Sequence, residues 1–177
     1  MNEVRILDKK FRELISEQAI KKRVDEIALQ INRDFTGSEV IFVGILNGAF
    51  MFAADLFRKI DLKAMITFVK LASYQGVSSS GAVRELIGWN EDLVNKKIIV
   101  VEDIVDTGAT LERIVNELVI RNVAEIKIAT MLLKPAAYTR DIPINYIGFE
   151  IPNKFVIGYG LDYNGYGRSL PSVYTMV

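Results

Sequence analysis

Apolar residues recur along this chain with two alternating spacings, one typical of helices and the other of buried strands. After Ser16, which can cap a helix, they recur at helical spacing until Thr36-Gly37-Ser38 breaks the pattern. The next run, 40–46, is apolar on both faces and rich in β-branched residues, as expected of a strand inside a parallel sheet. The same patterns predict further helices at about 50–59 and 110–121, and further strands at 64–72, 97–101, 125–133, 146–149 and 155–157.

Strands that alternate with helices indicate an α/β fold, here a doubly wound, mostly parallel twisted sheet flanked by helices. No internal repeat and no Pro-rich or Ser-rich linker divides the chain, so we expect residues 1–177 to form a single domain. Ligands of such sheets bind at the carboxyl ends of the strands. Three segments interrupt the alternation: 73–89, 134–145 and the tail from 158.

The composition excludes several kinds of site. Among the 177 residues, 22 are basic and 22 acidic, and this balance disfavours a nucleic-acid-binding surface. The chain has no His and no Cys, which excludes Ser-His-Asp triads, Cys-His pairs, zinc fingers and disulfides. The first residues are charged, unlike a signal peptide, and the apolar runs are too short to cross a bilayer. We therefore expect a cytoplasmic protein with no membrane partner.

Three carboxylates lie where the predicted strand 97–101 gives way to a helix: Glu102, Asp103 and Asp106. Burying unpaired carboxylates is costly, so they should face a cleft, a metal or the hydroxyls of a polyol. Residues 106–110 then supply hydroxyls, a glycine and the free N–H groups of a helix N-terminus, which suit a phosphate. Together these features favour a sugar phosphate; an acidic loop with a helix cap is the alternative at this point.

The segment VVEDIVDTGAT, residues 100–110, resembles the phosphoribosyl-pyrophosphate signature of type I phosphoribosyltransferases. The resemblance covers nearly the whole chain and extends to the bacterial hypoxanthine or hypoxanthine-guanine branch of that family. Its further motifs are Leu46-Asn47-Gly48-Ala49, Ser73-Tyr74 with Ser79-Ser80-Gly81, Lys134-Pro135 and the stretch 154–164. The signature alone specifies the superfamily, whereas FVIGYGLDYN combined with Lys134 points to 6-oxopurines.

The resemblance implies an Mg²⁺-dependent reaction of purine salvage. The 5-phosphoribosyl group would pass from phosphoribosyl pyrophosphate to N9 of hypoxanthine or guanine, giving a nucleoside monophosphate and pyrophosphate. It also implies the type I phosphoribosyltransferase fold, with a small hood built from the N-terminus and about 150–177. A flexible lid loop at about 73–89 and a homodimer or homotetramer complete what the family implies.

The resemblance also assigns roles around the signature. Glu102 and Asp103 would bind the ribose hydroxyls and, with Asp162, serve the Mg²⁺ site. The 5′-phosphate would be held by Thr107, Gly108 and Thr110, with backbone donors from Asp106 and Ala109. Asp106 is also the candidate catalytic proton acceptor at purine N7.

The remaining roles concern the purine and the pyrophosphate. Lys134 would donate to the 6-oxo group, Phe155 would stack on the base, Val156 would meet its pyrimidine edge through the backbone, and Asp162 would lie near its 2-substituent. Pyrophosphate would be bound by Leu46, Asn47, Gly48 and Arg168, with a cis peptide bond between Leu46 and Asn47. Ser73 and Tyr74 would close the lid. Many relatives carry Lys at position 47, so the Asn47 side chain removes a cation here.

Three other functions are weighed against this one. A transferase that prefers xanthine differs only at the 2-position of the purine, and the sequence leaves it open; Lys134 with Phe155-Val156 disfavours adenine and orotate. A regulator of the same fold that binds nucleic acid is disfavoured by the balanced charge. A flavodoxin-like nucleotide binder lacks support, because no G-x-G-x-x-G and no P-loop motif occurs.

Overall fold

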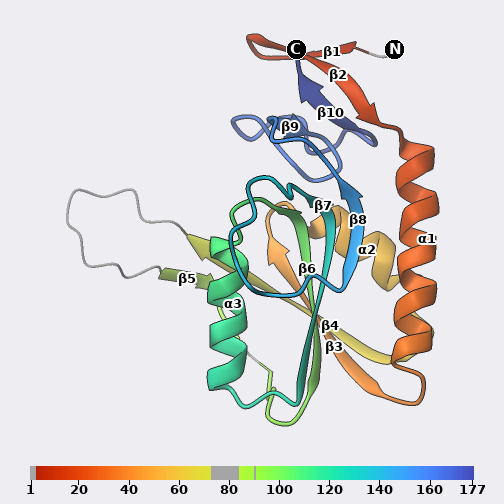
Figure 1. The fold of residues 1–177 in the computed structure, drawn as a ribbon, viewed down its shortest axis with the longest axis vertical. Coiled ribbons are helices and arrows are strands. Elements are labelled where there is room, and N and C mark those ends of the chain that lie inside the picture. Colours follow the sequence, from red (N-terminus) through yellow and green to blue (C-terminus); the bar gives the residue numbers. More distant parts are fainter. Residues whose placement is uncertain (1–2, 73–83, 90) are drawn as a thin grey trace.

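The computed structural model describes residues 3–72, 84–89 and 91–177, without the side chains of 71–72 and 84–87. A six-stranded sheet with helices on both faces forms the core, and a four-stranded sheet forms a hood beyond one end of it (Figure 1). The helices are α1 (Glu17–Asp34), α2 (Phe50–Phe57) and α3 (Ala109–Ile120). The strands are β1 (Glu3–Ile6), β2 (Lys9–Ile15), β3 (Glu39–Leu46), β4 (Lys63–Ala72), β5 (Arg84–Ile87), β6 (Lys97–Val105), β7 (Glu125–Leu133), β8 (Tyr146–Glu150), β9 (Val156–Ile157) and β10 (Val173–Met176).

The large sheet has the strand order β5-β4-β3-β6-β7-β8. The five strands β4, β3, β6, β7 and β8 pair in parallel, and β5 is antiparallel to β4 at the edge. The predicted mostly parallel sheet with flanking helices is thereby confirmed.

Strand β6 is longer than the apolar run that predicted it. Its backbone continues to pair with β7 beyond Val101, with Glu102 opposite Thr130 and Val105 opposite Leu133. The acidic pair at 102–103 therefore lies within the strand, whereas the hydrophobic pattern had placed it just after the strand's end.

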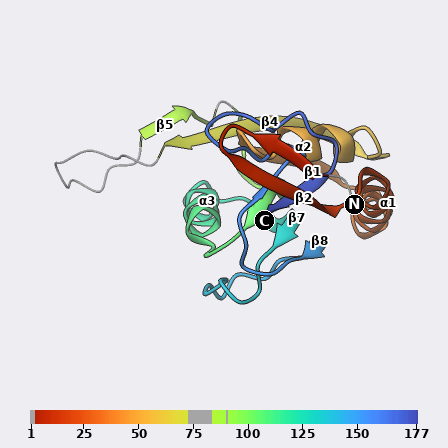
Figure 2. The same ribbon diagram turned by 90° about the horizontal axis from the view of Figure 1, so that it is seen from above.

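Side chains alternate between two apolar layers on the two faces of the sheet. Val40 and Phe42 pack in the layer that contains the buried face of α1 and part of α2. Ile41 and Val43 point the other way, into the layer beneath α3. Figure 2 shows α3 on one side of the sheet and α1 with α2 on the other. Helix α1 begins as predicted, because the Ser16 side chain accepts a hydrogen bond from the Ala19 N–H at 3.3 Å.

The hood is an antiparallel sheet with the order β1-β2-β10-β9, so the two ends of the chain build it together. Its small apolar cluster consists of Phe11, Ile157 and Tyr174 with partly buried neighbours. The hood implied by the resemblance is confirmed. The apolar patterns, however, did not reveal β1, β2 or β10, and only Val156–Ile157 of the predicted strand 155–157 forms β9.

Part of the segment 73–89 is regular, since β5 occupies 84–87. Ser73 and Tyr74 lie outside the described residues. Among the residues that the structure describes, no helix has the length and apolar character needed to cross a membrane.

Candidate active site

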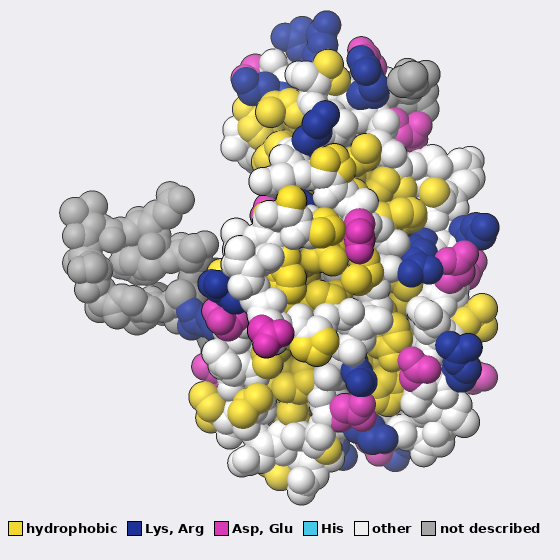
Figure 3. Space-filling view, viewed as in Figure 1, with side chains coloured by type: hydrophobic (Ala, Val, Ile, Leu, Met, Phe, Trp, Pro, Cys, Tyr) yellow, Lys and Arg dark blue, Asp and Glu magenta, His cyan; other side chains and the backbone are white. Residues whose placement is uncertain are grey.

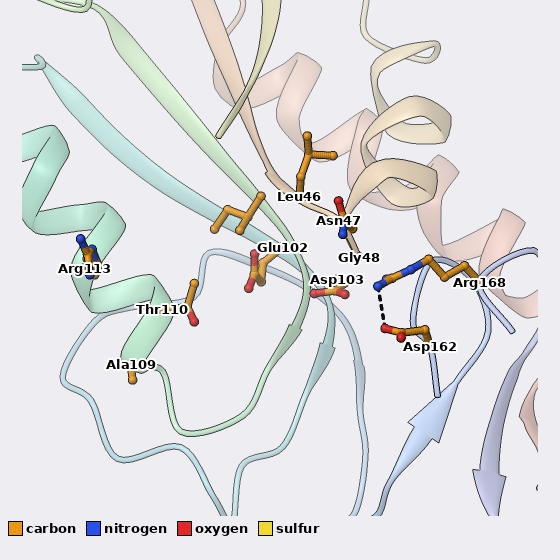
Figure 4. A pocket seen from close by; sticks show the side chains of 11 residues that line it. Leu46, Asn47, Gly48, Glu102, Asp103, Ala109, Thr110, Arg113, Asp162 and Arg168 are labelled. Atoms are coloured by element: carbon orange, nitrogen blue, oxygen red, sulfur yellow. Dashed lines mark ion pairs between the residues drawn. The ribbon is translucent and has the colours of Figure 1, made fainter. Parts of the chain in front are cut away.

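A cavity of about 510 Å³ opens where the carboxyl ends of β3 and β6 meet the hood (Figure 4). Three parts of the chain supply its walls: the loop after β3, the acidic end of β6 with the start of α3, and a loop of the hood. The lining residues are Ile45, Leu46, Asn47, Gly48, Glu102, Asp103, Ala109, Thr110, Arg113, Asp162 and Arg168. The fold thus gathers residues predicted for pyrophosphate, ribose and metal around one space.

The loop 46–48 contributes backbone to this cavity. The peptide bond between Leu46 and Asn47 is cis, as the resemblance implied. Gly48 lies so close to Asp103 that a Cβ atom at this position would overlap the carboxylate. Glycine is therefore the residue that fits here, and it leaves the backbone of the loop open to a ligand.

A buried carboxylate, Glu102, and a partly buried one, Asp103, form the floor of the cavity. Glu102 is 7% exposed, and its Oε2 has no hydrogen-bond partner among the residues that the structure describes. Burial, reinforced by the charge of Asp103, raises the pKa of Glu102 well above its usual value. Burial also raises the pKa of Asp103 to about 6, although its Oδ1 accepts a hydrogen bond from the Ile104 N–H at 2.8 Å. Hydrogen bonds from ligand hydroxyls, or a bound cation, would offset the cost of burying these carboxylates.

A smaller hollow of about 80 Å³ lies beside the cavity and is lined by Glu102 and residues 104–111. Gly108 precedes α3 with φ +85°, a left-handed conformation that suits glycine. The Thr107 hydroxyl accepts a hydrogen bond from the Ala109 N–H at 3.4 Å. The first turn of α3 adds N–H groups that have no partner within the helix, so the hollow has the chemistry of an anion site.

Lys134 and Asp106 form an ion pair at the same end of the sheet. The Lys134 Nζ lies 2.7 Å from the Asp106 Oδ2. Lys134 is only 8% exposed, whereas the carboxylate of Asp106 is half-exposed and so accessible to a ligand. The predicted oxo-group donor and the predicted proton acceptor are therefore direct neighbours.

Of the purine-binding residues predicted on the hood, Asp162 lines the cavity, whereas Phe155 and Val156 lie outside its lining. The Phe155 ring is 45% exposed, with the rings of Phe11 and Tyr163 behind it at centroid distances of 6.4 and 6.0 Å. Val156 is buried in β9. A partly exposed aromatic ring that packs against other rings can stack on a base.

Asp162 and Arg168 pair across the mouth of the cavity at 2.6 Å (Figure 4). The other oxygen of Asp162 accepts a hydrogen bond from the Gly165 N–H at 2.6 Å. Arg168 also donates to the Gly160 carbonyl oxygen at 2.6 Å. Both side chains are therefore held in place by the hood itself.

The acidic residues suit a loosely held magnesium ion better than a closed cage. Within the described part of the chain, no three acidic side chains come together as a set of metal ligands, so Glu102, Asp103 and Asp162 do not enclose an ion. Mg²⁺ prefers to keep several waters and to bind one or two carboxylates together with substrate oxygens. The unpartnered Glu102 Oε2 beside Asp103 fits that type of binding.

The sequence reasoning missed two residues that line the cavity, Ile45 and Arg113. Arg113 follows Thr110 by three positions on α3, and residues at this spacing share a helix face. That spacing could have revealed Arg113. Ile45 gave no such signal, because it belongs to the apolar run 40–46 that predicts a buried strand.

Known proteins resemble this chain over nearly its whole length. Residues 12–164 match the model of the phosphoribosyl transferase domain family. The hypoxanthine-guanine phosphoribosyltransferase of Aquifex aeolicus is 38% identical over 98% of both chains, and the hypoxanthine phosphoribosyltransferase of Salmonella typhimurium is 39% identical over 90% of this chain and 92% of its own. A crystal structure of a hypoxanthine-guanine phosphoribosyltransferase from Bacillus anthracis superimposes with a TM-score of 0.87 at 37% identity, covering 94% of this chain and 96% of the other. The chain therefore belongs to the phosphoribosyl transferase domain family.

Proposed function

We propose that this protein is a hypoxanthine or hypoxanthine-guanine phosphoribosyltransferase of purine salvage. It transfers the 5-phosphoribosyl group of phosphoribosyl pyrophosphate to N9 of the base. The observation that carries the proposal is the position of two neighbouring carboxylates, the buried Glu102 and the partly buried Asp103, between two backbone loops suited to anions. This arrangement matches a pentose that bears phosphate groups at both ends, and the full-length relatives carry the corresponding names.

The donor would be bound mainly by the core of the protein. The hollow at residues 106–110 holds the 5′-phosphate through N–H groups and hydroxyls. Glu102 and Asp103 accept hydrogen bonds from the ribose hydroxyls, which relieves the cost of their burial. Backbone N–H groups of the loop 46–48, together with Arg168, bind the pyrophosphate and stabilise its charge as it leaves.

The base would be bound between the core and the hood. Lys134 donates a hydrogen bond to the 6-oxo group of the base. A 6-amino group could not accept this hydrogen bond. Phe155 stacks on the ring. As the C1′–oxygen bond to pyrophosphate breaks and N9 bonds to C1′, the proton on purine N7 passes to Asp106. The reaction needs no covalent intermediate, so positioning and electrostatics carry the catalysis.

Three finer features belong to the same proposal. Glu102, Asp103 and Asp162 would hold Mg²⁺ together with water, and the ion would neutralise charge on the pyrophosphate. The protein works in the cytoplasm as a homodimer or homotetramer. The core and the hood act as one domain over residues 1–177.

A pyrophosphate-release assay tests the proposal directly. The protein, phosphoribosyl pyrophosphate and Mg²⁺ are mixed with hypoxanthine, guanine, xanthine or adenine in turn. Release with hypoxanthine or guanine and none with adenine is expected. Release with xanthine alone would identify the protein as a xanthine-specific transferase instead. No release with any 6-oxopurine would refute the proposed function.

The role of Asp106 is tested by Asp106→Asn. Loss of the proton acceptor should lower kcat by about 10²–10⁴-fold, with a smaller change in the KM of the base. Asp61→Asn is the matched control, because Asp61 is exposed on the loop before β4, at the opposite end of the sheet. Unchanged turnover of Asp106→Asn would remove Asp106 from the chemistry.

A further inference from the structure

A buried tyrosine of the hood is hydrogen-bonded to the helix that follows the loop 46–48, which we call the pyrophosphate loop. The Tyr159 hydroxyl donates to the Asp55 Oδ2 at 2.9 Å. Tyr159 is 5% exposed and packs in the main apolar layer of the core. Asp55 lies on α2, which starts two residues after Gly48. The hydrogen bond therefore joins the hood to the element that carries the loop 46–48.

The backbone around Tyr159 makes a second contact with the same loop. Gly158, Tyr159 and Gly160 all have positive φ, at 92°, 48° and 99°, and the chain turns sharply there. The turn brings Gly160 so close to the Gly48 carbonyl oxygen that a Cβ atom at position 160 would overlap it. The hood thus touches the pyrophosphate loop directly, beside the hydrogen bond to α2.

This turn is also linked to residues proposed for the reaction. Gly160 donates its N–H to the Arg168 carbonyl oxygen at 3.0 Å, and the Arg168 side chain donates back to the Gly160 carbonyl oxygen. Arg168 in turn pairs with Asp162. A shift of the turn would therefore move the ion pair at the mouth of the cavity.

We propose that Asp55 and Tyr159 are positioning residues whose hydrogen bond sets the hood against the pyrophosphate loop. This role rests on the proposed function, since it concerns the alignment of the hood's Phe155 and Arg168 with a donor bound on the core. Neither residue lines the cavity. A charged acceptor makes such a hydrogen bond stronger than one between neutral groups, and its partly buried setting reduces screening by water.

The chain contains a matched control for this pair. The Tyr146 hydroxyl donates to the Asp34 Oδ2 at the same distance of 2.9 Å, and Tyr146 is also 5% exposed. That pair joins the end of α1 to the start of β8, at the end of the sheet opposite the cavity. Tyr146→Phe therefore removes an equivalent hydrogen bond without disturbing the site.

The experiment compares Tyr159→Phe with Tyr146→Phe in chemical denaturation and in steady-state kinetics. Both variants should lose similar stability. Only Tyr159→Phe should lower kcat, by about 10- to 100-fold, which corresponds to one hydrogen bond to a charged group. Its KM for phosphoribosyl pyrophosphate should change less than about threefold, because most of the donor site lies on the core and stays intact, and the loss lies in alignment.

Variants of Asp55 give an independent measurement. Asp55→Asn keeps an acceptor oxygen and should retain kcat within about threefold of the wild type. Asp55→Ala should match Tyr159→Phe, and the double variant should be no slower than either single one. These results hold even if Tyr159→Phe folds poorly, since Asp55→Ala leaves the buried ring in place.

Two failures can be told apart. If the wild type releases no pyrophosphate with any purine, the proposed function is wrong. If the wild type is active while Tyr159→Phe and Tyr146→Phe have the same kcat, the pair is structural and the positioning role is refuted.

Discussion

Asp103→Asn should make the free protein more stable while it destroys activity. Asp103 is held at the floor of the cavity with its Oδ1 accepting the Ile104 N–H, and burial raises its pKa from 3.8 to about 6. The ionised Asp103 therefore lowers the free energy of unfolding at neutral pH. An asparagine removes the charge and keeps an oxygen that can accept the same hydrogen bond.

The size of the effect follows from the shift in pKa. A rise of about two units at about 1.4 kcal/mol each amounts to about 3 kcal/mol above pH 7. Asp103 keeps some exposure to solvent, which screens part of this cost, so a gain of about 1–2 kcal/mol is expected. For a chain of this length each kcal/mol raises Tm by about 2–4 °C.

The gain must depend on pH with a definite sign. Because the pKa of Asp103 is higher in the folded than in the unfolded protein, its ionisation reduces stability as pH rises from about 4 through about 6. The advantage of Asp103→Asn should therefore be complete at pH 8 and absent near pH 4. Urea unfolding of wild type and variant at both pH values measures the difference, with Asp61→Asn, an exposed carboxylate, as the control.

Two results would refute the reasoning. One is no gain in stability at pH 8; the other is an equal gain at pH 4 and pH 8, which would assign the effect to something other than the charge. Pyrophosphate release by the same preparations completes the test, since a gain in stability combined with a loss of turnover is the pattern of a residue kept for function.

Three further predictions use other parts of the structure. Gly48→Ala should abolish pyrophosphate release while circular dichroism shows a folded protein, because the added Cβ would displace the Asp103 carboxylate; activity near that of the wild type would contradict the close packing. Ser16→Ala should cost about 1 kcal/mol in urea unfolding through loss of the α1 cap, with kcat unchanged. Lys134→Gln should lower kcat/KM for hypoxanthine by about 10- to 100-fold in the release assay, because a charged donor and the partner of Asp106 are both lost; a loss of less than threefold would exclude contact with the 6-oxo group.

The core of the fold could be predicted from the sequence because its signals are local. The strand at 40–46 is apolar on both faces, as a strand covered by helices on both sides must be. The cap at Ser16 and the helical spacing after it fixed the start of α1 to within a residue. Interruptions in these patterns marked the loops.

The hood could not be predicted from periodicity, since its strands are short and show no regular alternation of buried and exposed residues. In β1 and β2 most side chains face solvent, and β10 has four residues. The pairing of β2 with β10 joins residues more than 150 positions apart, as Tyr174 with Glu13 shows, and no local pattern carries that information. Only the family resemblance pointed to this sheet. The Asp55–Tyr159 hydrogen bond across 104 positions escaped prediction for the same reason.

The acidic pair shows how a small difference in the position of a strand end changes the chemistry. In a loop, Glu102 and Asp103 could both turn toward solvent. As neighbours within β6 they must point to opposite faces of the sheet. Glu102 accordingly lines the hollow beside α3, and Asp103 lies against Gly48 on the side of α2. In the proposed complex, the end of one strand would present one carboxylate to the 5′-phosphate side of a pentose and the other to its pyrophosphate side. Glu102→Gln and Asp103→Asn should therefore weaken different halves of the donor site, and inorganic phosphate and pyrophosphate, used as separate inhibitors, can distinguish them.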